Sequence, residues 1–223
     1  LNTIYDKFLY EEWRDVKVLW LGLMSPYHLH TSNKAVRTLE DLRGLRLHAS
    51  GLAAELAKIW GATPISLFSH DGTKRLDMRS IFYTGLKNGD IDGALSSFEL
   101  TRDFQLGDVT NYHTYLNVIR DVNATAMNIL VWNSLPGDIK KVFEETNAWA
   151  QQEFDQAQKD ESMQARDLLL QKGHEIIELS HEEFSRWKKA ARPVVDENIR
   201  QLDAQGIPAT AIADEIQLLA AGK

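Results

Sequence analysis

The sequence predicts an α/β protein, and three observations lead to that class. Short apolar segments that suit strands alternate, at short intervals, with amphipathic segments that suit helices. One of them, at residues 16–24, is apolar almost throughout, as expected for a strand buried on both faces of a mostly parallel sheet. After Asp138 no Pro or Gly occurs until Gly173, which allows one helix at residues 136–172 with a length of about 55 Å.

The remaining elements follow from apolar spacing and from end signals such as Ser, Pro and Gly. We expect helices at residues 3–13, 52–60, 80–87, 97–104, 136–172, 180–205 and 209–221. We expect strands at residues 16–24, 45–49, 63–67, 91–95, 109–119, 124–132 and 174–179, with an extended segment at 27–31. A polar, charged stretch at residues 68–79 interrupts this rhythm, and we interpret it as a surface loop, with a functional lid as the alternative.

The stretch at residues 38–51, TLEDLRGLRLHASG, joins a helix start, a turn, a strand and a second helix start. Thr38 can cap a one-turn helix that carries two acids, and Ser50 can cap the helix that follows the strand at 45–49. A strand that runs directly into a helix N-terminus presents side chains and free backbone N–H groups to a ligand. His48 lies at this junction and is therefore a candidate binding residue.

The composition bounds the function classes. With 223 residues, of which 43% are hydrophobic, the chain is long enough to bury a core as one or two domains. No window approaches eighteen consecutive apolar residues, so no membrane-spanning segment is expected. The formal net charge is −7 and the basic residues do not cluster, which argues against a nucleic-acid partner. The absence of cysteine excludes disulfides, thiolate metal ligands and cysteine nucleophiles.

Histidines and paired acids are the residues that could carry chemistry. His28 and His30 share one face of an extended segment, and with His48 they suggest a three-histidine metal site. They lack an acidic partner and a motif spacing, so we predict neither a metal nor a cofactor. Asp90 and Asp92 suit a Gly-containing turn before a strand. No motif for a hydrolytic nucleophile, a zinc protease or a phosphate-binding loop occurs, and no catalytic residue is predicted.

Four segments in order carry a family resemblance: RTLEDLRGLRLHASGLAAELAKIWGATPISL, FYTGLKNGDIDGA, VTNYHT and NILVWNSLPGDIKKVFEE. They resemble the extracytoplasmic substrate-binding proteins of tripartite ATP-independent periplasmic (TRAP) transporters. The resemblance implies a bilobed, class II periplasmic-binding-protein-like α/β fold, with two mixed sheets flanked by helices and a ligand cleft between the lobes. The long helix at 136–172 would span both lobes.

The resemblance also implies a division of the chain. Residues 1–25 and 125–165 would form the remainder of lobe I, with hinge strands and the spanning helix. Residues 26–124 and 166–223 would form lobe II, with the C-terminal helices. Family members carry a signal peptide and a first βαβ region before the position that matches Leu1, so both are expected outside this sequence.

Five residues correspond to, or adjoin, positions that contact the solute in this family. His48 stands where the family usually has an arginine that pairs with the solute carboxylate. His28 matches a second arginine of some members, Ser96 a position that is commonly asparagine or aromatic, and Phe68 an aromatic that packs on the solute. Ser50, next to the junction, is expected to face the cleft. Because histidine lacks the fork of a guanidinium group, a polar sugar-like solute becomes an alternative to an organic acid.

The function that the resemblance implies is transport without catalysis. An exported, periplasmic protein would close at a hinge around a small solute and deliver it to TRAP membrane subunits. We expect a monomer. Two other classes stay open: the ligand-sensing effector domain of a regulator, and a metal-dependent hydrolase or lyase that uses the histidines. A fragment with no function of its own is a third alternative.

Overall fold

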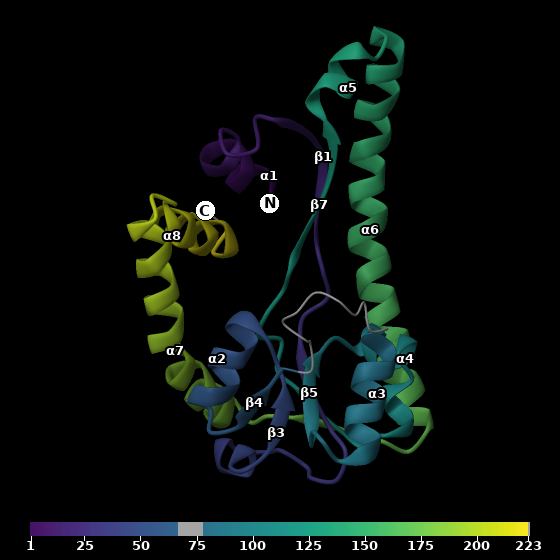
Figure 1. Cartoon of the computed structure of the whole chain (residues 1–223), viewed down its shortest axis with the longest axis vertical. Helices are drawn as coiled ribbons and strands as arrows, with labels where there is room; N and C mark the ends of the chain where they lie inside the picture. The colour runs from purple at the N-terminus through teal and green to yellow at the C-terminus, as the bar shows by residue number, and fades with distance from the viewer. Residues whose placement is uncertain (67–77, 223) are drawn as a thin grey trace. The chain divides into compact units, whose positions relative to one another are not determined.

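The computed structural model describes residues 1–66 and 78–222, which form two compact units (Figure 1). Unit 1 comprises Leu1–Met24, Asp121–Gln158 and Val195–Lys223, and unit 2 comprises Ser25–Arg120 and Lys159–Val194. Strands and helices alternate in unit 2, and the predicted α/β class is confirmed. Across the described ranges, no helix has both the length and the apolar character that a bilayer-spanning helix needs.

Unit 2 is built on a mixed six-stranded sheet with the order β4-β3-β5-β2-β6-β8. Its strands are β2 (His28–Thr31), β3 (Arg46–His48), β4 (Thr63–Ile65), β5 (Gly93–Ser96), β6 (Tyr112–Tyr115) and β8 (Glu175–Glu178). Only β2 runs against its neighbours, because it pairs antiparallel with both β5 and β6 while the other pairs are parallel. The C-terminal ends of five strands and the N-terminal end of β2 therefore share one edge of the sheet.

The core of unit 2 lies between this sheet and its helices α2 (Gly51–Ile59), α3 (Met78–Asn88), α4 (Phe98–Asp103) and the first part of α7 (His181–Ala204). Its largest apolar cluster contains Leu47, Leu56, Trp60 and Trp187. The two indole rings lie 5.0 Å apart, and the Nε1–H of Trp60 donates to the backbone oxygen of Trp187 at 3.1 Å. The buried tryptophans thus join α2 to α7, and their polar groups are satisfied.

Gly93 is needed where β5 passes β2. A Cβ at this position would lie 2.5 Å from the backbone oxygen of His30 and 2.8 Å from Cγ2 of Thr31. We expect Gly93→Ala to lower the free energy of unfolding by about 1–3 kcal/mol, because the strands must move apart. Urea unfolding would measure this loss of stability. Gly137→Ala is the matched control, since an added Cβ there meets nothing within 4 Å, and an equal loss in both variants would contradict this account.

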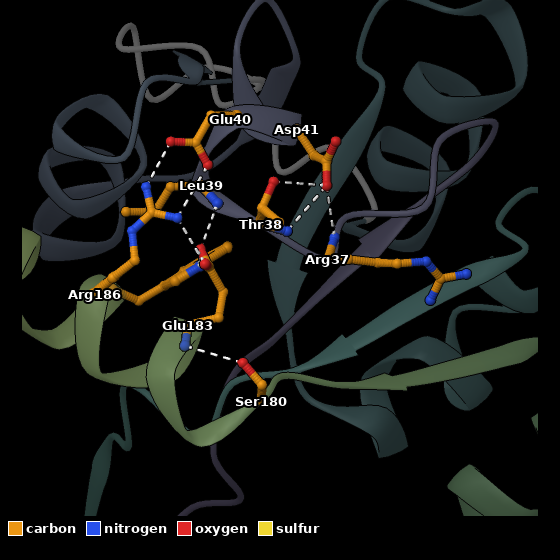
Figure 2. Close-up of polar contacts among 9 residues, drawn as sticks. Arg37, Thr38, Leu39, Glu40, Asp41, Ser180, Glu183 and Arg186 are labelled. Carbon is orange, nitrogen blue, oxygen red and sulfur yellow. Dashed lines mark hydrogen bonds and ion pairs between the residues drawn. The ribbon is translucent and has the colours of Figure 1, made fainter.

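A polar network ties the turn before β3 to the start of α7 (Figure 2). The Thr38 N–H and Oγ1 donate to Asp41 Oδ2 at 2.9 and 3.0 Å, which confirms the predicted cap on the short 3-10 helix Leu39–Leu42. The Glu183 N–H donates to Ser180 Oγ at 3.1 Å, as its capping box predicts. The Glu183 carboxylate, however, accepts from the Leu39 N–H at 2.8 Å and so joins two distant parts of the chain.

Unit 1 contains an antiparallel ribbon of β1 (Val16–Leu23) and β7 (Val122–Asn128), which lie side by side in Figure 1. The strand predicted at 16–24 is present, but the prediction of a strand buried in a mostly parallel sheet is wrong. Most residues of β1 are only half-buried, and Phe154 of the long helix packs over its Gly22. A two-stranded ribbon covered by one helix therefore accounts for the apolar sequence.

Two other predicted strands are shorter in the structure than in the prediction. The strand predicted at 124–132 ends at Asn128, whose Oδ1 accepts from the N–H groups of Leu130 and Val131 and begins helix α5 (Ile129–Ser134). Of the strand predicted at 109–119, only β6 (Tyr112–Tyr115) is extended in the structure. A 3-10 turn precedes it, and Asn117 leaves the extended conformation with a φ of 54°.

The long helix α6 (Gly137–Gln171) confirms the helix predicted at 136–172. The boundaries between the two units fall inside α6 and inside α7. The lobes implied by the resemblance differ from the compact units mainly at residues 159–165, which cluster with unit 2, and at residues 195–223, which cluster with unit 1. Helix α8 (Ala209–Ala220) contributes to this, because Glu215 pairs with Lys7 at 2.6 Å. The N-terminal helix is shorter than predicted and consists of Asn2–Ile4 and a π-helical turn at Tyr5–Leu9.

Candidate functional site

Three of the five predicted site residues lie at one edge of the unit 2 sheet. His48 ends β3, Ser96 ends β5, and His28 begins β2 directly opposite Ser96. Their relative exposures are 3%, 3% and 1%, so all three residues are buried at this edge. Ser50 is exposed at the start of α2 and makes no side-chain cap, which corrects the predicted capping bond. Phe68 lies outside the described residues.

His48 is neutral at physiological pH. Burial lowers the pKa of its imidazole, and a hydrogen bond with the backbone of Ile65 opposes this shift. The ring of Phe82 lies edge-on at 4.4 Å. Because the neutral ring carries no charge, His48 offers a hydrogen bond to a solute but does not replace an arginine as a partner of a carboxylate.

His28 is held in one tautomer by the backbone beyond β6. Its Nδ1 accepts from the N–H groups of Leu116 and Asn117 at 3.1 and 3.3 Å, so the hydrogen of the neutral ring is on Nε2. The ring lies between Tyr115 at 4.4 Å and Phe98 at 4.6 Å. Burial, His30 and Arg166 lower the pKa of His28 to about 3. His28 is therefore a neutral donor within an aromatic stack.

Three further histidines form a directional chain of hydrogen bonds. His30 Nε2 lies 3.0 Å from the backbone oxygen of Ser96, which only accepts, so this nitrogen donates and His30 Nδ1 is the acceptor. His113 Nδ1, at 2.7 Å, must then donate to His30, and His113 Nε2 accepts from His174 Nδ1 at 2.9 Å. Burial lowers the pKa of both His30 and His113. Protonation of either ring would set two donors against each other.

The sequence alone could not show that His30 bonds to His113, because this requires the register of β2 against β6. His30 and His113 are directly opposite in the β2–β6 pair, but each strand alone shows a single histidine at that position. Within residues 1–66 and 78–222, no group of three or more His, Asp or Glu side chains is placed to hold a metal ion. His28 and His30 do lie on one face, as predicted, with ring centroids 6.5 Å apart.

A cavity of about 670 Å³ opens at the same edge of the sheet, beyond the ends of β6 and β8. Its aromatic walls are Phe98, Tyr115 and Phe184, and Arg166 of α6 supplies a guanidinium group. The sequence prediction missed Arg166, because its helix was interpreted only as a spanning element. No local motif marks it, since the residues around the cavity come from four separate stretches of the sequence.

Comparisons with known proteins give a consistent family. Residues 12–201 match the model of a family described as bacterial extracellular solute-binding protein, family 7. A TRAP periplasmic solute binding protein from Desulfovibrio salexigens is 28% identical and superimposes with a TM-score of 0.78, over 97% of this chain and 65% of that one. A TRAP solute binding protein from Rhodoferax ferrireducens, in complex with copurified benzoate, is 20% identical, with a TM-score of 0.83 over 99% of this chain and 67% of that one.

An uncharacterized protein of Haemophilus influenzae is 27% identical over 165 residues, which are 73% of this chain and 47% of that protein. The chain thus spans about half the length of the curated relatives that it matches.

Proposed function

Because the chain belongs to the bacterial extracellular solute-binding proteins of family 7, we propose that it captures a small solute in the periplasm and delivers it to a TRAP-type membrane transporter. It acts as a monomer and performs no catalysis. The single observation that carries this proposal is the juxtaposition of His28, His48 and Ser96 at one edge of the unit 2 sheet. Open α/β sheets bind ligands at the carboxyl ends of their strands.

The solute is a small organic acid, with a polar sugar-like compound as the second class. Copurified benzoate in the Rhodoferax ferrireducens protein supports the first class. The neutral His48 leaves its position without a cation, so the acid group must find its partner elsewhere. Histidine and serine at the sheet edge provide hydrogen bonds that either class of solute can use.

The role of His48 is tested by His48→Ala. A thermal-shift screen of small organic acids and sugars on the purified protein identifies a solute, because a ligand that binds the folded state raises the midpoint of unfolding. We expect His48→Ala to weaken binding of that solute about tenfold, the effect of one lost hydrogen bond in a site. Isothermal titration calorimetry measures it. Lys58→Ala, on the exposed side of α2, is the control, and an unchanged affinity in His48→Ala would remove His48 from the site.

A further inference from the structure

The backbone that follows β6 leaves the sheet through a bulge. Strand β2 pairs Leu29 with Thr114, but the N–H of Tyr27 donates to the backbone oxygen of Ile119 at 2.9 Å. The step from Leu29 to Tyr27 is two residues, whereas the step from Thr114 to Ile119 is five, so the second strand carries extra residues. The extra residues of a bulge have no ladder partner on the opposite strand, and their N–H groups need another acceptor.

The side chain of His28 supplies that acceptor. The N–H groups of Leu116 and Asn117 both donate to Nδ1 of His28, at 3.1 and 3.3 Å. Asn117 has a φ of 54°, and a left-handed residue in a turn directs successive N–H groups toward a common acceptor. Asparagine is one of the few side chains that tolerate this conformation. One ring nitrogen thus replaces the backbone acceptors that the bulge lacks.

Packing fixes the imidazole and the bulge relative to each other. Tyr115, the residue before the bulge, stacks on the His28 ring at 4.4 Å with an angle of 26°, and Phe98 of α4 lies 4.6 Å from the same ring. Leu116 is 1% exposed and belongs to the same core cluster as Trp187. The ring therefore cannot turn away from the two N–H groups without breaking other contacts.

The protonation of His28 suits this role. Only a neutral ring with its hydrogen on Nε2 accepts at Nδ1. Burial, His30 on β2 and Arg166 on α6 all disfavour the charged form, and the pKa of His28 is lowered to about 3. The acceptor is therefore present throughout the physiological pH range. Because of these positions, Asn and Gln are informative replacements: the Asn Oδ1 takes the place of Nδ1, whereas the Gln amide reaches the place of Nε2.

Two features of unit 2 depend on the course of this backbone. Tyr115, Leu116 and Asn117 line the cavity of about 670 Å³, so the bulge sets the position of one of its walls. The same stretch leads to Arg120, the last residue of unit 2 before the chain enters unit 1. The two bonds to His28 thus hold a cavity wall and the start of the segment that leaves the unit.

We propose that His28 is a positioning residue of the solute site, whose Nδ1 holds the bulge at Leu116 and Asn117 and with it the wall of the cavity. The inference rests on the proposed function for the solute. It goes beyond that function, because it gives Nδ1 a role that needs no contact with a solute. A hydrogen bond from Nε2 to a solute is a separate property of the same ring.

Amide hydrogen exchange, measured by NMR at pH 7, tests the two bonds directly. Relative to the amides of β2 and β6 in the same variant, the Leu116 and Asn117 amides should exchange about tenfold or more faster in His28→Gln than in the wild type. In His28→Asn this ratio should return to within about threefold of the wild type. His181→Gln, at an exposed position, is the matched control and should leave the ratio unchanged.

The nitrogen-15 spectrum of the wild-type imidazoles tests the same role without a substitution. At pH 7, His28 should show a protonated Nε2 and an unprotonated, hydrogen-bonded Nδ1. A proton on Nδ1 would overturn the inference. Equal exchange of the two amides in His28→Gln and the wild type, or in His28→Gln and His28→Asn, would overturn it as well.

Calorimetry with benzoate and glucuronate separates this inference from the proposed function. A probe that binds the wild type should bind His28→Gln about tenfold or more weakly, although glutamine keeps a donor at the place of Nε2. Unchanged affinity in His28→Gln would show that the bulge does not position the solute site. If neither probe binds the wild type, the proposed capture of an organic acid fails, while the exchange rates and the imidazole spectrum still decide the role of Nδ1.

Discussion

Lowering the pH from 7.5 to 5.5 should reduce the free energy of unfolding by roughly 4 kcal/mol or more, because buried histidines, among them His28, His30 and His113, resist protonation in the folded state. In the unfolded chain a histidine takes up a proton near pH 6.5. In the folded protein, burial lowers the pKa of His28 to about 3 and also lowers those of His30 and His113. The unfolded state therefore binds more protons below pH 6.5, and acid favours unfolding.

The sign and the window of this effect follow from those shifts. The stabilisation is complete above about pH 6.5 and is lost as the pH falls from there toward the folded-state pKa, with about 1.4 kcal/mol per histidine for each pH unit. Unperturbed carboxyl groups titrate near pH 4, so the range from 6.5 to 5 reports mainly on histidines. The hydrogen-bond chain adds to the shift, since a proton on His30 Nδ1 would oppose the His113 donor and a proton on His113 Nε2 would oppose the His174 donor.

Urea unfolding at several pH values measures this dependence. His113→Gln should make the slope of stability against pH shallower by about 1.4 kcal/mol per pH unit, whatever its effect on absolute stability, because one histidine with a lowered pKa is removed. His181, exposed at the start of α7, is the control, and His181→Gln should keep the steep slope. A wild-type stability that stays constant from pH 7.5 to 5.5 would show that these histidines are not buried as described.

Replacing Glu183 should produce the second large effect, a loss of about 2–4 kcal/mol in the free energy of unfolding for Glu183→Ala. Glu183 is 8% exposed, and its carboxylate accepts from the Leu39 N–H at 2.8 Å, from Trp187 Nε1 at 3.0 Å and from Arg186 Nη1 at 2.7 Å. Figure 2 shows Leu39 and Arg186 around this carboxylate. Its removal leaves the first two donors buried without a partner, and an unsatisfied buried donor costs more than the net gain of one hydrogen bond.

Two further variants separate this effect from the loss of an ion pair. Glu183→Gln keeps one acceptor oxygen and should lose about half as much as Glu183→Ala. Glu40→Ala removes the other carboxylate that pairs with Arg186, but this pair lies on the surface, and only a small loss is expected. Urea unfolding compares all three, and similar losses in Glu183→Ala and Glu40→Ala would contradict the role given to the buried bonds.

Periodicity and end signals predicted most elements of the fold. The helix at 136–172 followed from the absence of Pro and Gly, and α6 matches it to within a residue at each end. The sequence predictions failed where pairing or local side-chain bonds decide the structure. The Asn128 side chain caps helix α5, so the apolar run after it is helical and not a strand. Strand β1 pairs antiparallel with β7 and forms a two-stranded ribbon instead of part of a parallel sheet. A single sequence carries no direct signal for either, because short apolar runs suit strands and buried helices alike.

For the candidate site, the strand-to-helix junction at His48 was predictable because it is local. Arg166 was not, because a helix of 35 residues has many exposed cations and only the cavity distinguishes this one. The same holds for the bond between His30 and His113, which are 83 residues apart in the sequence. Contacts of this kind depend on the register of strands that lie far apart along the chain.

The central claim, that this protein binds a small solute at the edge of the unit 2 sheet, is tested most directly by calorimetric titration of the purified protein with benzoate, benzamide and a polar sugar acid. We predict saturable binding of an acid with one site per chain, weakened in His48→Ala but not in Lys58→Ala. Absence of saturable heat with every acid and sugar tested, or binding that His48→Ala leaves unchanged, would contradict the claim.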